Sequence, residues 1–385
     1  MPPLAPSRLS MTAARRAALA LVLAFGAPAC ATRTAAPRAD AAAARPTPAS
    51  YPGASWERIA RPESAGWSQA GLDSVRARLT LLPSTGFMAV VGGRVLFEYG
   101  DVQAVSYLAS VRKSILSMLF GNYVARGTIR LDRTLAEIGI DDIGGLTAAE
   151  KEATVRDLLS ARSGVYHAAS NSGDDLASAP PRGSQRHGTY HLYSNWDFNA
   201  VGAIFERETG RSIFDALETD LARPIGMQDF DRSRHRMSGD STRSVHLAYH
   251  MHLSTRDMAR VGHLMLREGS WAGRQLVPRD WVRESTRPVT PVSQMNPARR
   301  REGPFGYGYL WWVWDGAAAR GPYEGAYTGL GAVGQHIAVL PALDLVVAHK
   351  TRPGQDRSVS HPEFLAVLEL LVRARCAEGR CPAGR

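Results

Sequence analysis

Lysine is scarce in this sequence, although the chain is strongly basic. Of 46 lysine and arginine residues, only Lys113, Lys151 and Lys350 are lysines, and the formal net charge is +10. Arginine cannot lose its proton in a protein, whereas a buried lysine can. Because this chain uses arginine almost wherever it needs a positive charge, a retained lysine is a candidate for chemistry that arginine cannot perform.

Cysteine is equally scarce, with only Cys30, Cys376 and Cys381. The last two lie five residues apart near the C-terminus and can close a small disulfide in an oxidising compartment. We favour this disulfide over a metal or redox pair, because no cluster of further ligands accompanies the two cysteines.

Long apolar runs and basic runs are missing from most of the chain. Beyond the N-terminal region, no run is long and apolar enough to span a bilayer. The arginines are scattered, apart from Arg299-Arg300-Arg301, and aromatic residues are not interleaved with them. We therefore interpret the charge as a solvated surface and expect no nucleic-acid partner. A length of 385 residues, a hydrophobic fraction of 44% and eight tryptophans suit a globular enzyme.

The N-terminus has the pattern of an export signal. Two arginines at positions 15 and 16 precede an apolar run over residues 17–25 and small residues up to Cys30. We predict a signal peptide over residues 1–30, translated from Met1 or Met11, and an exported protein, periplasmic or extracellular. Residues 27–30 also resemble a bacterial lipoprotein cleavage site. A membrane tether through a lipidated Cys30 and plain signal cleavage are therefore both kept as hypotheses.

The rest of the chain divides into a tether, one folded domain and a short tail. Residues 31–50 are rich in Ala, Pro, Arg and Thr, and we expect them to form a flexible tether. The folded domain is expected over residues 51–375, and the tail with its disulfide over residues 376–385. The sequence contains no internal repeats.

Strand patterns lie at both ends of the domain, with helical patterns between them. We predict hairpins at 86–91 with 94–99 and at 334–340 with 345–350, and an aromatic strand at 307–314. Helices are predicted over 71–82, 148–159, 198–208 and 364–373, with another that opens at Ser110 and ends at Gly127. This order predicts an α/β (α+β) fold, in which an antiparallel sheet flanked by helices is interrupted by a large helical insertion over about residues 111–250.

The first candidate site is Ser110 with Lys113, three residues later. On a helix, positions i and i+3 lie on the same face. A lysine one turn after a serine can take the hydroxyl proton and make the serine a nucleophile. The alternative is a helix-capping serine with an exposed lysine. Apolar neighbours, among them Val111, Ile115 and Leu116, argue against that exposure.

Tyr193-Ser194-Asn195 precedes a predicted helix and is a second candidate element. Its phenol can relay a proton if a nearby ammonium lowers the phenol pKa, and its amide can hold both a lysine and a substrate carbonyl. The third element is the run Tyr327-Thr328-Gly329-Leu330-Gly331, in which a strand N–H can join the Ser110 N–H as an oxyanion hole. A capping turn and a glycine-rich turn are the corresponding structural interpretations.

These three elements, in this order, resemble the motif set of the serine β-lactamase and penicillin-binding-protein superfamily. The similarity is greatest to its class C-related branch: class C β-lactamases, D-alanyl-D-alanine carboxypeptidases, family VIII-type esterases and 6-aminohexanoate-dimer hydrolases. It spans about residues 55–375 and includes the stretches 154–164, 254–281, 307–312 and 334–337. The resemblance implies a β-lactamase/transpeptidase-like fold, without a cofactor or a metal.

The resemblance also implies roles for individual residues. Ser110 would be the acylated nucleophile and Lys113 its activating base. Tyr193 would protonate the leaving group and later activate the hydrolytic water, while Asn195 would orient Lys113 and the substrate. Leu330 is the candidate for the second oxyanion N–H, with Val333 or Gly334 as alternatives if the strand aligns differently.

Two departures from the superfamily pattern bear on the substrate. Tyr327, which with Gly329 would line the substrate site, stands where relatives usually place a cation that grips a substrate carboxylate. Unless an arginine takes over that role, this favours neutral esters or amides. The chain also lacks a Glu-x-x-x-Asn pattern, so a glutamate-driven deacylation is not supported.

Two other patterns compete with this site. Ser68 in Gly66-Trp67-Ser68-Gln69-Ala70 nearly matches a nucleophile elbow, but no convincing strand precedes it, and we interpret Ser68 as a helix cap. His246 and His250, spaced for one helix face, could form a metal site with His252. No HExxH-type glutamate accompanies these histidines, which favours packing or surface roles.

The sequence therefore predicts a serine hydrolase that acts through an acyl-enzyme on a small ester, amide or peptide. A D-alanyl-D-alanine carboxypeptidase or class C-like β-lactamase is the second hypothesis. A non-catalytic binding or sensor module is the third, since relatives can keep a fold without turnover. The presence of Ser110, Lys113, Tyr193 and Asn195 together favours catalysis.

Overall fold

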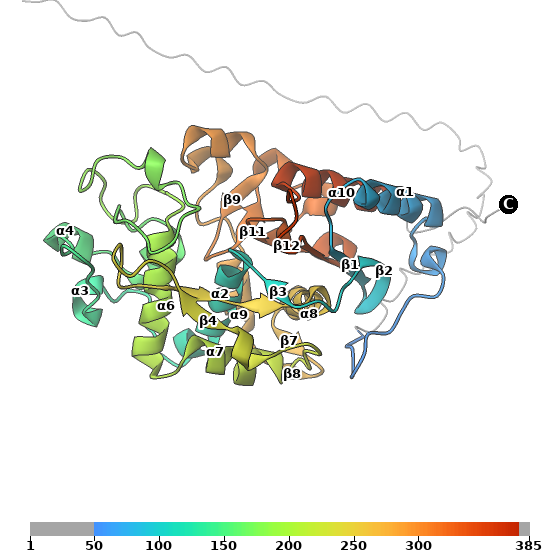
Figure 1. Ribbon diagram of the computed structural model, residues 1–385, viewed down its shortest axis with the longest axis horizontal. Coiled ribbons are helices and arrows are strands. Elements are labelled where there is room, and N and C mark those ends of the chain that lie inside the picture. Colours follow the sequence, from blue (N-terminus) through green and yellow to red (C-terminus); the bar gives the residue numbers. More distant parts are fainter. Residues whose placement is uncertain (1–49, 377–385) are drawn as a thin grey trace, which may run out of the picture. The chain divides into compact units, whose positions relative to one another are not determined.

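A seven-stranded antiparallel sheet forms the centre of the fold in the computed structural model, which describes residues 50–376 (Figure 1). Its strand order is β2-β1-β13-β12-β11-β10-β9. These strands are β1 (Gly86–Val91), β2 (Arg94–Gly100), β9 (Phe305–Tyr307), β10 (Trp312–Trp314), β11 (Tyr327–Gly331), β12 (Gln335–Leu340) and β13 (Leu345–Lys350). Three small two-stranded sheets pair β3 (Ser106–Tyr107) with β6 (His252–Leu253), β4 (Arg236–Ser238) with β5 (Ala248–His250), and β7 (Ser270–Trp271) with β8 (Arg274–Gln275).

Ten α-helices accompany these strands within residues 50–376. They are α1 (Gln69–Thr80), α2 (Val111–Ala125), α3 (Leu135–Ile138), α4 (Ala148–Lys151), α5 (Val155–Leu159), α6 (Asn195–Thr209), α7 (Ile213–Ala216), α8 (Thr255–Leu266), α9 (Arg279–Ser285) and α10 (His361–Arg373). A π-helical turn, Leu217–Ala222, follows α7, and short 3-10 helices such as Ala298–Glu302 lie in the loops. None of the helices in the described part of the chain could cross a membrane.

Helices cover both faces of the large sheet, which explains why β12 and β13 are buried along their whole length. Successive side chains of a strand point to opposite faces. On β13, His349 contacts Phe364 of α10, while Val346 lies against Gly262 of α8. Figure 1 shows α1 beside α10 on one side of the sheet and α8 on the other.

Both predicted hairpins are confirmed, β1 with β2 and β12 with β13. The Gly92-Gly93 turn of the first hairpin has φ values of 59° and 81°, which glycine adopts without steric cost. The predicted α/β fold with an antiparallel sheet flanked by helices is also confirmed. Residues 111–250 contain α2 to α7, followed by the short strands β4 and β5.

Two predicted elements were wrong. The strand expected over residues 307–314 is two antiparallel strands, β9 and β10, because the chain reverses where Gly308 N–H donates to the Trp311 carbonyl and Leu310 has a φ of 63°. The alternating aromatic residues at 307–314 predict one continuous strand, so the sequence pattern gives no sign of this turn. The helix expected over residues 148–159 is two helices, because Thr154 caps a new one and forms a reciprocal capping box with Asp157.

The two competing patterns are resolved by local structure. Ser68 caps α1, because its hydroxyl accepts a hydrogen bond from the Gly71 N–H. His250 lies in strand β5 and His246 in the preceding loop, so the two histidines do not share a helix face, which agrees with the rejection of a helical metal site. Within residues 50–376, no group of three His, Cys, Asp or Glu residues could hold a metal ion.

The predictions for the N-terminus and the tail fall almost entirely outside the described residues. These are the signal peptide over residues 1–30 with Cys30, the tether over residues 31–50 and Cys381. Cys376 is described and is disulfide-bonded. Its pairing with Cys381 stays a prediction.

The close packing of α8 on the sheet gives a test of the fold. In Gly262→Ala, the new Cβ would lie 2.4 Å from Val346 Cγ1 and 3.0 Å from Ile337 Cγ2. Overpacking of this kind costs about 1–3 kcal/mol, more than the roughly 1 kcal/mol that alanine gains over glycine in a helix. We expect a lower urea midpoint for Gly262→Ala. Gly53→Ala is the control, because its Cβ would meet no atom within 4 Å; equal midpoints for the two variants would contradict the packing.

Candidate active site

The first turn of α2 presents Ser110 and Lys113 on one face. Ser110 is the residue before the helix and already has helical dihedrals, φ −77° and ψ −9°. Lys113 Nζ lies 2.8 Å from Ser110 Oγ. The preceding residue, Ala109, has a φ of 47°, in the left-handed region that residues other than glycine rarely adopt. The backbone is thus strained directly before the candidate nucleophile, as is common at functional sites.

The start of α6 brings Tyr193 and Asn195 to the same lysine. Lys113 Nζ lies 2.8 Å from the Tyr193 hydroxyl and donates to Asn195 Oδ1 at 2.7 Å. Asn195 Nδ2 donates to the Ser172 carbonyl, which fixes the amide orientation and leaves Oδ1 facing the lysine. The Asn195 N–H donates to Asp174, so this helix start is held from the adjoining loop.

The Lys113 amine is enclosed by protein. Its side chain is buried, and Nζ lies 4.6 Å from the ring centroids of both Tyr193 and Phe198. Burial lowers the pKa of Lys113 well below its usual value; the charge of Arg112 acts in the same direction and that of Asp174 in the opposite one. A neutral amine has a lone pair that can accept the Ser110 proton.

The pKa of Tyr193 moves in the other direction. Burial raises it to about 12, against the opposing effects of a hydrogen bond with Ser110 and of the charges of Arg112 and Arg300. The expectation that a neighbouring ammonium lowers this pKa is therefore outweighed by burial. Tyr193 remains protonated at neutral pH and can donate its proton to a leaving group.

Strand β11 passes the start of α2 at very close range, which only glycine permits. A Cβ added to Gly331 would lie 2.6 Å from the Leu108 carbonyl oxygen and 3.2 Å from Ser110 N. One added to Gly329 would lie 3.0 Å from Ser114 Oγ. The glycines of the third motif are therefore explained by the approach of the strand to the helix, and this approach brings the strand backbone to the candidate nucleophile.

The register of β11 shows which of its N–H groups faces the site. Trp314 N–H donates to the Ala326 carbonyl, and β10 ends its pairing opposite Thr328. Because strand N–H groups alternate in direction, Leu330 N–H points to the same edge, beyond Trp312, the first residue of β10. Val333 and Gly334, the alternatives to Leu330, belong to the turn between β11 and β12. Among residues 50–376 the Ser110 N–H has no backbone partner, so it and Leu330 N–H are the candidate pair of oxyanion donors.

Tyr327 is not brought to this cluster. Its ring packs edge-on against Trp311, with the centroids 5.4 Å apart, and it lines a cavity together with Glu268 and Arg267. It lies four residues from Gly331, about 13 Å along an extended strand.

Several residues near the cluster were not identified from the sequence. Phe198 encloses Lys113, Asp174 holds the start of α6, and the Arg300 guanidinium carbon lies 5.7 Å from the Tyr193 ring centroid. Arg300 belongs to the basic run noted in the sequence, which was the one signal for it. Loop 171–187 had no pattern that marked Asp174.

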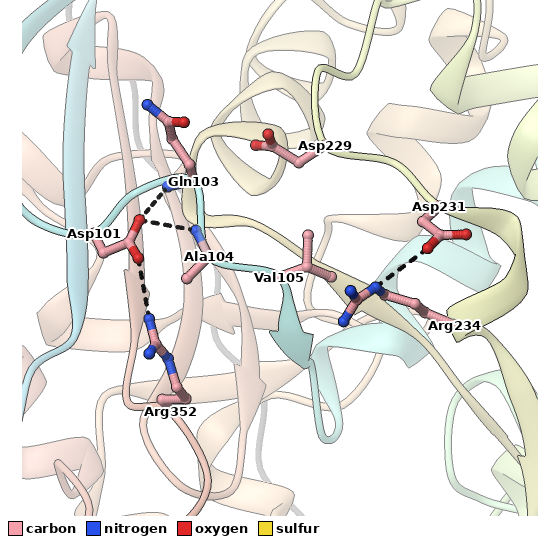
Figure 2. Close-up of a pocket in the computed structure, with 8 residues that line it drawn as sticks. All are labelled: Asp101, Gln103, Ala104, Val105, Asp229, Asp231, Arg234 and Arg352. Carbon is pink, nitrogen blue, oxygen red and sulfur yellow. Dashed lines mark hydrogen bonds and ion pairs between the residues drawn. The ribbon is translucent and has the colours of Figure 1, made fainter.

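A cavity of about 580 Å³ elsewhere in the fold does not offer comparable chemistry (Figure 2). Each charged side chain that lines this cavity forms an ion pair with a residue of opposite charge. Asp101 pairs with Arg352 at 3.2 Å, Asp231 with Arg234 at 3.3 Å, and Asp229 with Arg256, which the picture does not draw. No group there combines a nucleophile with a base.

Structural comparisons identify the fold as that of β-lactamases and transpeptidases. A "Putative 6-aminohexanoate-dimer hydrolase from Bacillus anthracis" has a TM-score of 0.60 and 16% identity, covering 83% of this chain and 86% of that one. A penicillin-binding protein homologue from Caulobacter crescentus has a TM-score of 0.57 and 15% identity, covering 80% and 99%. A family VIII carboxylesterase has a TM-score of 0.56 and 15% identity, covering 80% and 99%.

The family model described as Beta-lactamase matches residues 73–358. The chain therefore belongs to the Beta-lactamase family, and the resemblance found from its motifs is confirmed. Its structural neighbours include hydrolases. No match was found among curated protein sequences.

The chemistry of Lys113 can be tested by Lys113→Arg. An arginine stays charged and cannot accept the Ser110 proton, so we expect the rate of Ser110 labelling by a fluorophosphonate to fall by about 100-fold or more, the usual size of general-base effects. Lys151→Arg is the matched control, because Lys151 makes a surface ion pair with Asp141. Undiminished labelling of Lys113→Arg would contradict the assignment.

The lowered pKa of Lys113 predicts a pH profile. The labelling rate of Ser110 should rise as Lys113 loses its proton and level off well below pH 10.5, the ordinary value for lysine. The measurement is the labelling rate at a series of pH values, corrected for reagent hydrolysis. A rate that still climbs through pH 10.5 would show that Lys113 is not neutral at lower pH.

Proposed function

We propose that this protein is a serine hydrolase that forms an acyl-enzyme on Ser110 and hydrolyses ester or amide bonds of small substrates. One observation carries the proposal: the buried Lys113 amine lies within 2.8 Å of the Ser110, Tyr193 and Asn195 oxygens together. The alternative interpretation, a helix-capping serine with an exposed lysine, does not explain why these three oxygens surround a buried amine.

The geometry supports a complete proton path for acylation. Neutral Lys113 accepts the Ser110 proton while Oγ attacks the substrate carbonyl. The resulting oxyanion accepts hydrogen bonds from the backbone N–H groups of Ser110 and Leu330. As the tetrahedral intermediate collapses, Tyr193 gives its proton to the leaving group and takes one from Lys113, 2.8 Å away. The net transfer is from Ser110 to the leaving group.

Deacylation follows the same path with water as the nucleophile. The neutral Lys113 amine, acting through the Tyr193 hydroxyl, accepts a proton from the water that attacks the ester at Ser110. The proton then returns to Ser110 Oγ as the acid product leaves. No carboxylate base is required. Asn195 keeps Lys113 in place throughout, because its amide is anchored on Ser172.

A second candidate function is that of a D-alanyl-D-alanine carboxypeptidase or a class C-like β-lactamase. The Beta-lactamase family match and the penicillin-binding protein homologue among the neighbours favour it. A non-catalytic sensor module is the third candidate. A buried lysine close to three functional groups disfavours it, because such a costly arrangement serves no obvious structural purpose.

We further propose that the protein is exported, with Cys30 either lipidated as a membrane tether or removed with the signal peptide. The charged and apolar pattern before Cys30 supports this proposal. The disulfide at Cys376 supports it too, because disulfides persist in oxidising compartments. We propose no nucleic-acid partner.

Intact-mass analysis with 4-nitrophenyl acetate and with benzylpenicillin tests the function. We expect an acetyl adduct and turnover that Ser110→Ala abolishes and Ser68→Ala retains. Ser68→Ala loses only a helix cap, worth about 1 kcal/mol.

Each alternative has its own outcome in this experiment. A long-lived penicilloyl adduct on Ser110 would indicate a peptidase, and a short-lived one a lactamase. Hydrolysis that survives in Ser110→Ala would refute the proposed nucleophile. Failure of acetyl, penicilloyl and fluorophosphonate reagents alike to label Ser110 would favour the sensor module.

A further inference from the structure

A small cavity adjoins the edge of β11 that carries Leu330. Its volume is about 200 Å³, below the roughly 300 Å³ at which whole-ligand pockets begin, so it can hold one part of a substrate. Its walls are largely apolar, and Phe305, Trp312, Leu330 and Leu365 contribute to them. Leu330 is also the candidate oxyanion residue, so this cavity lies next to the position of the scissile carbonyl.

Arg300 brings a positive charge to this apolar wall. Its guanidinium carbon lies 5.0 Å from the Trp312 ring centroid and 5.7 Å from that of Tyr193. Arg300 Nε donates to Asp175 Oδ2 at 3.0 Å, and Nη2 lies 2.9 Å from the same oxygen. Asp175 is buried, so the guanidinium is held in one orientation beside these two aromatic rings, whose centroids are 5.3 Å apart. About 30% of the Arg300 side chain remains accessible.

The charge of Arg300 is not fully compensated. Asp175 also pairs with Arg299, so one carboxylate serves two guanidinium groups and a net positive charge remains. Among residues 50–376, Asp175 is the only carboxylate paired with either arginine, and Arg300 Nη1 has no hydrogen-bond partner. A guanidinium edge with free donors, partly withdrawn from water, is suited to binding a carboxylate.

We propose that this cavity binds an apolar part of the substrate that carries a carboxylate, and that Arg300 is the ligand of that carboxylate. The inference rests on the proposed hydrolase function and specifies its substrate class: esters or amides with an anionic group a few carbons from the scissile carbonyl. Arg300 contacts the substrate but takes no part in the proton transfers. It would supply, from the loop before β9, the positive charge that Tyr327 does not.

Two pairs of ester substrates test this proposal. 4-Nitrophenyl hydrogen adipate and 4-nitrophenyl hexanoate have six-carbon acyl chains and differ in the terminal carboxylate. 4-Acetoxybenzoate and its methyl ester place the same difference on the leaving group. The kcat/KM ratio of the charged to the neutral ester is measured for each pair, at low and high salt.

Three variants separate substrate binding from other roles of Arg300. Arg300→Gln removes the charge and Arg300→Lys keeps it without the planar fork. Arg301→Gln is the matched control, because it removes one charge from the same 3-10 helix, while Arg301 bonds the Met295 carbonyl and Asn296 and does not line the cavity. Thermal midpoints and circular dichroism show whether each variant is folded.

We expect wild type to prefer the charged ester in at least one pair. Arg300→Gln should lower kcat/KM for that ester about 10-fold or more, mainly through KM, and change the neutral ester less than about twofold, because a charge-assisted hydrogen bond is lost. Arg300→Lys should fall between, and Arg301→Gln should resemble wild type. High salt should reduce the preference.

Two outcomes would overturn the inference. If Arg300→Gln lowers kcat/KM equally for charged and neutral esters, Arg300 affects hydrolysis through its charge on Tyr193 and does not bind the substrate. If the charged-to-neutral ratio is unchanged in both pairs, the cavity does not bind the anion. Either result, with neutral-ester hydrolysis still lost in Ser110→Ala, leaves the proposed function intact. Hydrolysis that persists in Ser110→Ala would instead refute the function.

Discussion

The burial of one amine, Lys113 Nζ, is the constraint on which the rest of the site depends. An ammonium withdrawn from water is costly, so burial favours the neutral form. The same burial keeps Tyr193 protonated, because a phenolate would also lose its hydration. Burial thus favours a neutral amine and a protonated phenol 2.8 Å apart, which are the protonation states that the proposed mechanism requires.

The fold maintains this arrangement because three of its elements meet around the Lys113 amine. Helix α2 supplies the serine and the lysine, the start of α6 supplies the phenol and the amide, and β11 closes against α2 through glycines. Since β10 begins opposite Thr328, the last residues of β11 have a free edge close to Ser110, the candidate nucleophile. The short strand β10 and the glycine at position 331 thus both leave the β11 backbone accessible near Ser110.

Much of this could be predicted from the sequence, because it depends on local patterns. The hairpins, the helix at Ser110 and the order of the three motifs are local features that one sequence displays. The pairing of Arg300 with Asp175 joins residues 125 positions apart, and the basic run that contains Arg300 gives no sign of this partner. The turn between β9 and β10 was missed because both strands are aromatic. The pKa of Tyr193 depends on burial, which spacing alone does not reveal.

The scarcity of lysine has a structural explanation that extends beyond Lys113. Lys151 is the exception, on the surface in an ion pair with Asp141. Lys350, on β13, is buried, and burial lowers its pKa to about 7. Its Nζ donates to the carbonyls of Ser106 and Leu253, which belong to the paired strands β3 and β6.

Strand β3 leads directly to Ser110, so Lys350 anchors on the central sheet the segment that carries the candidate nucleophile. A compact amine fits between two carbonyls, where the broad guanidinium of arginine would have to displace them. Two of the three lysines in this arginine-rich chain therefore occupy buried sites that suit a compact amine, one at each end of the segment from Ser106 to Lys113. Lysine is retained there for the size of its head group and for its ability to lose a proton.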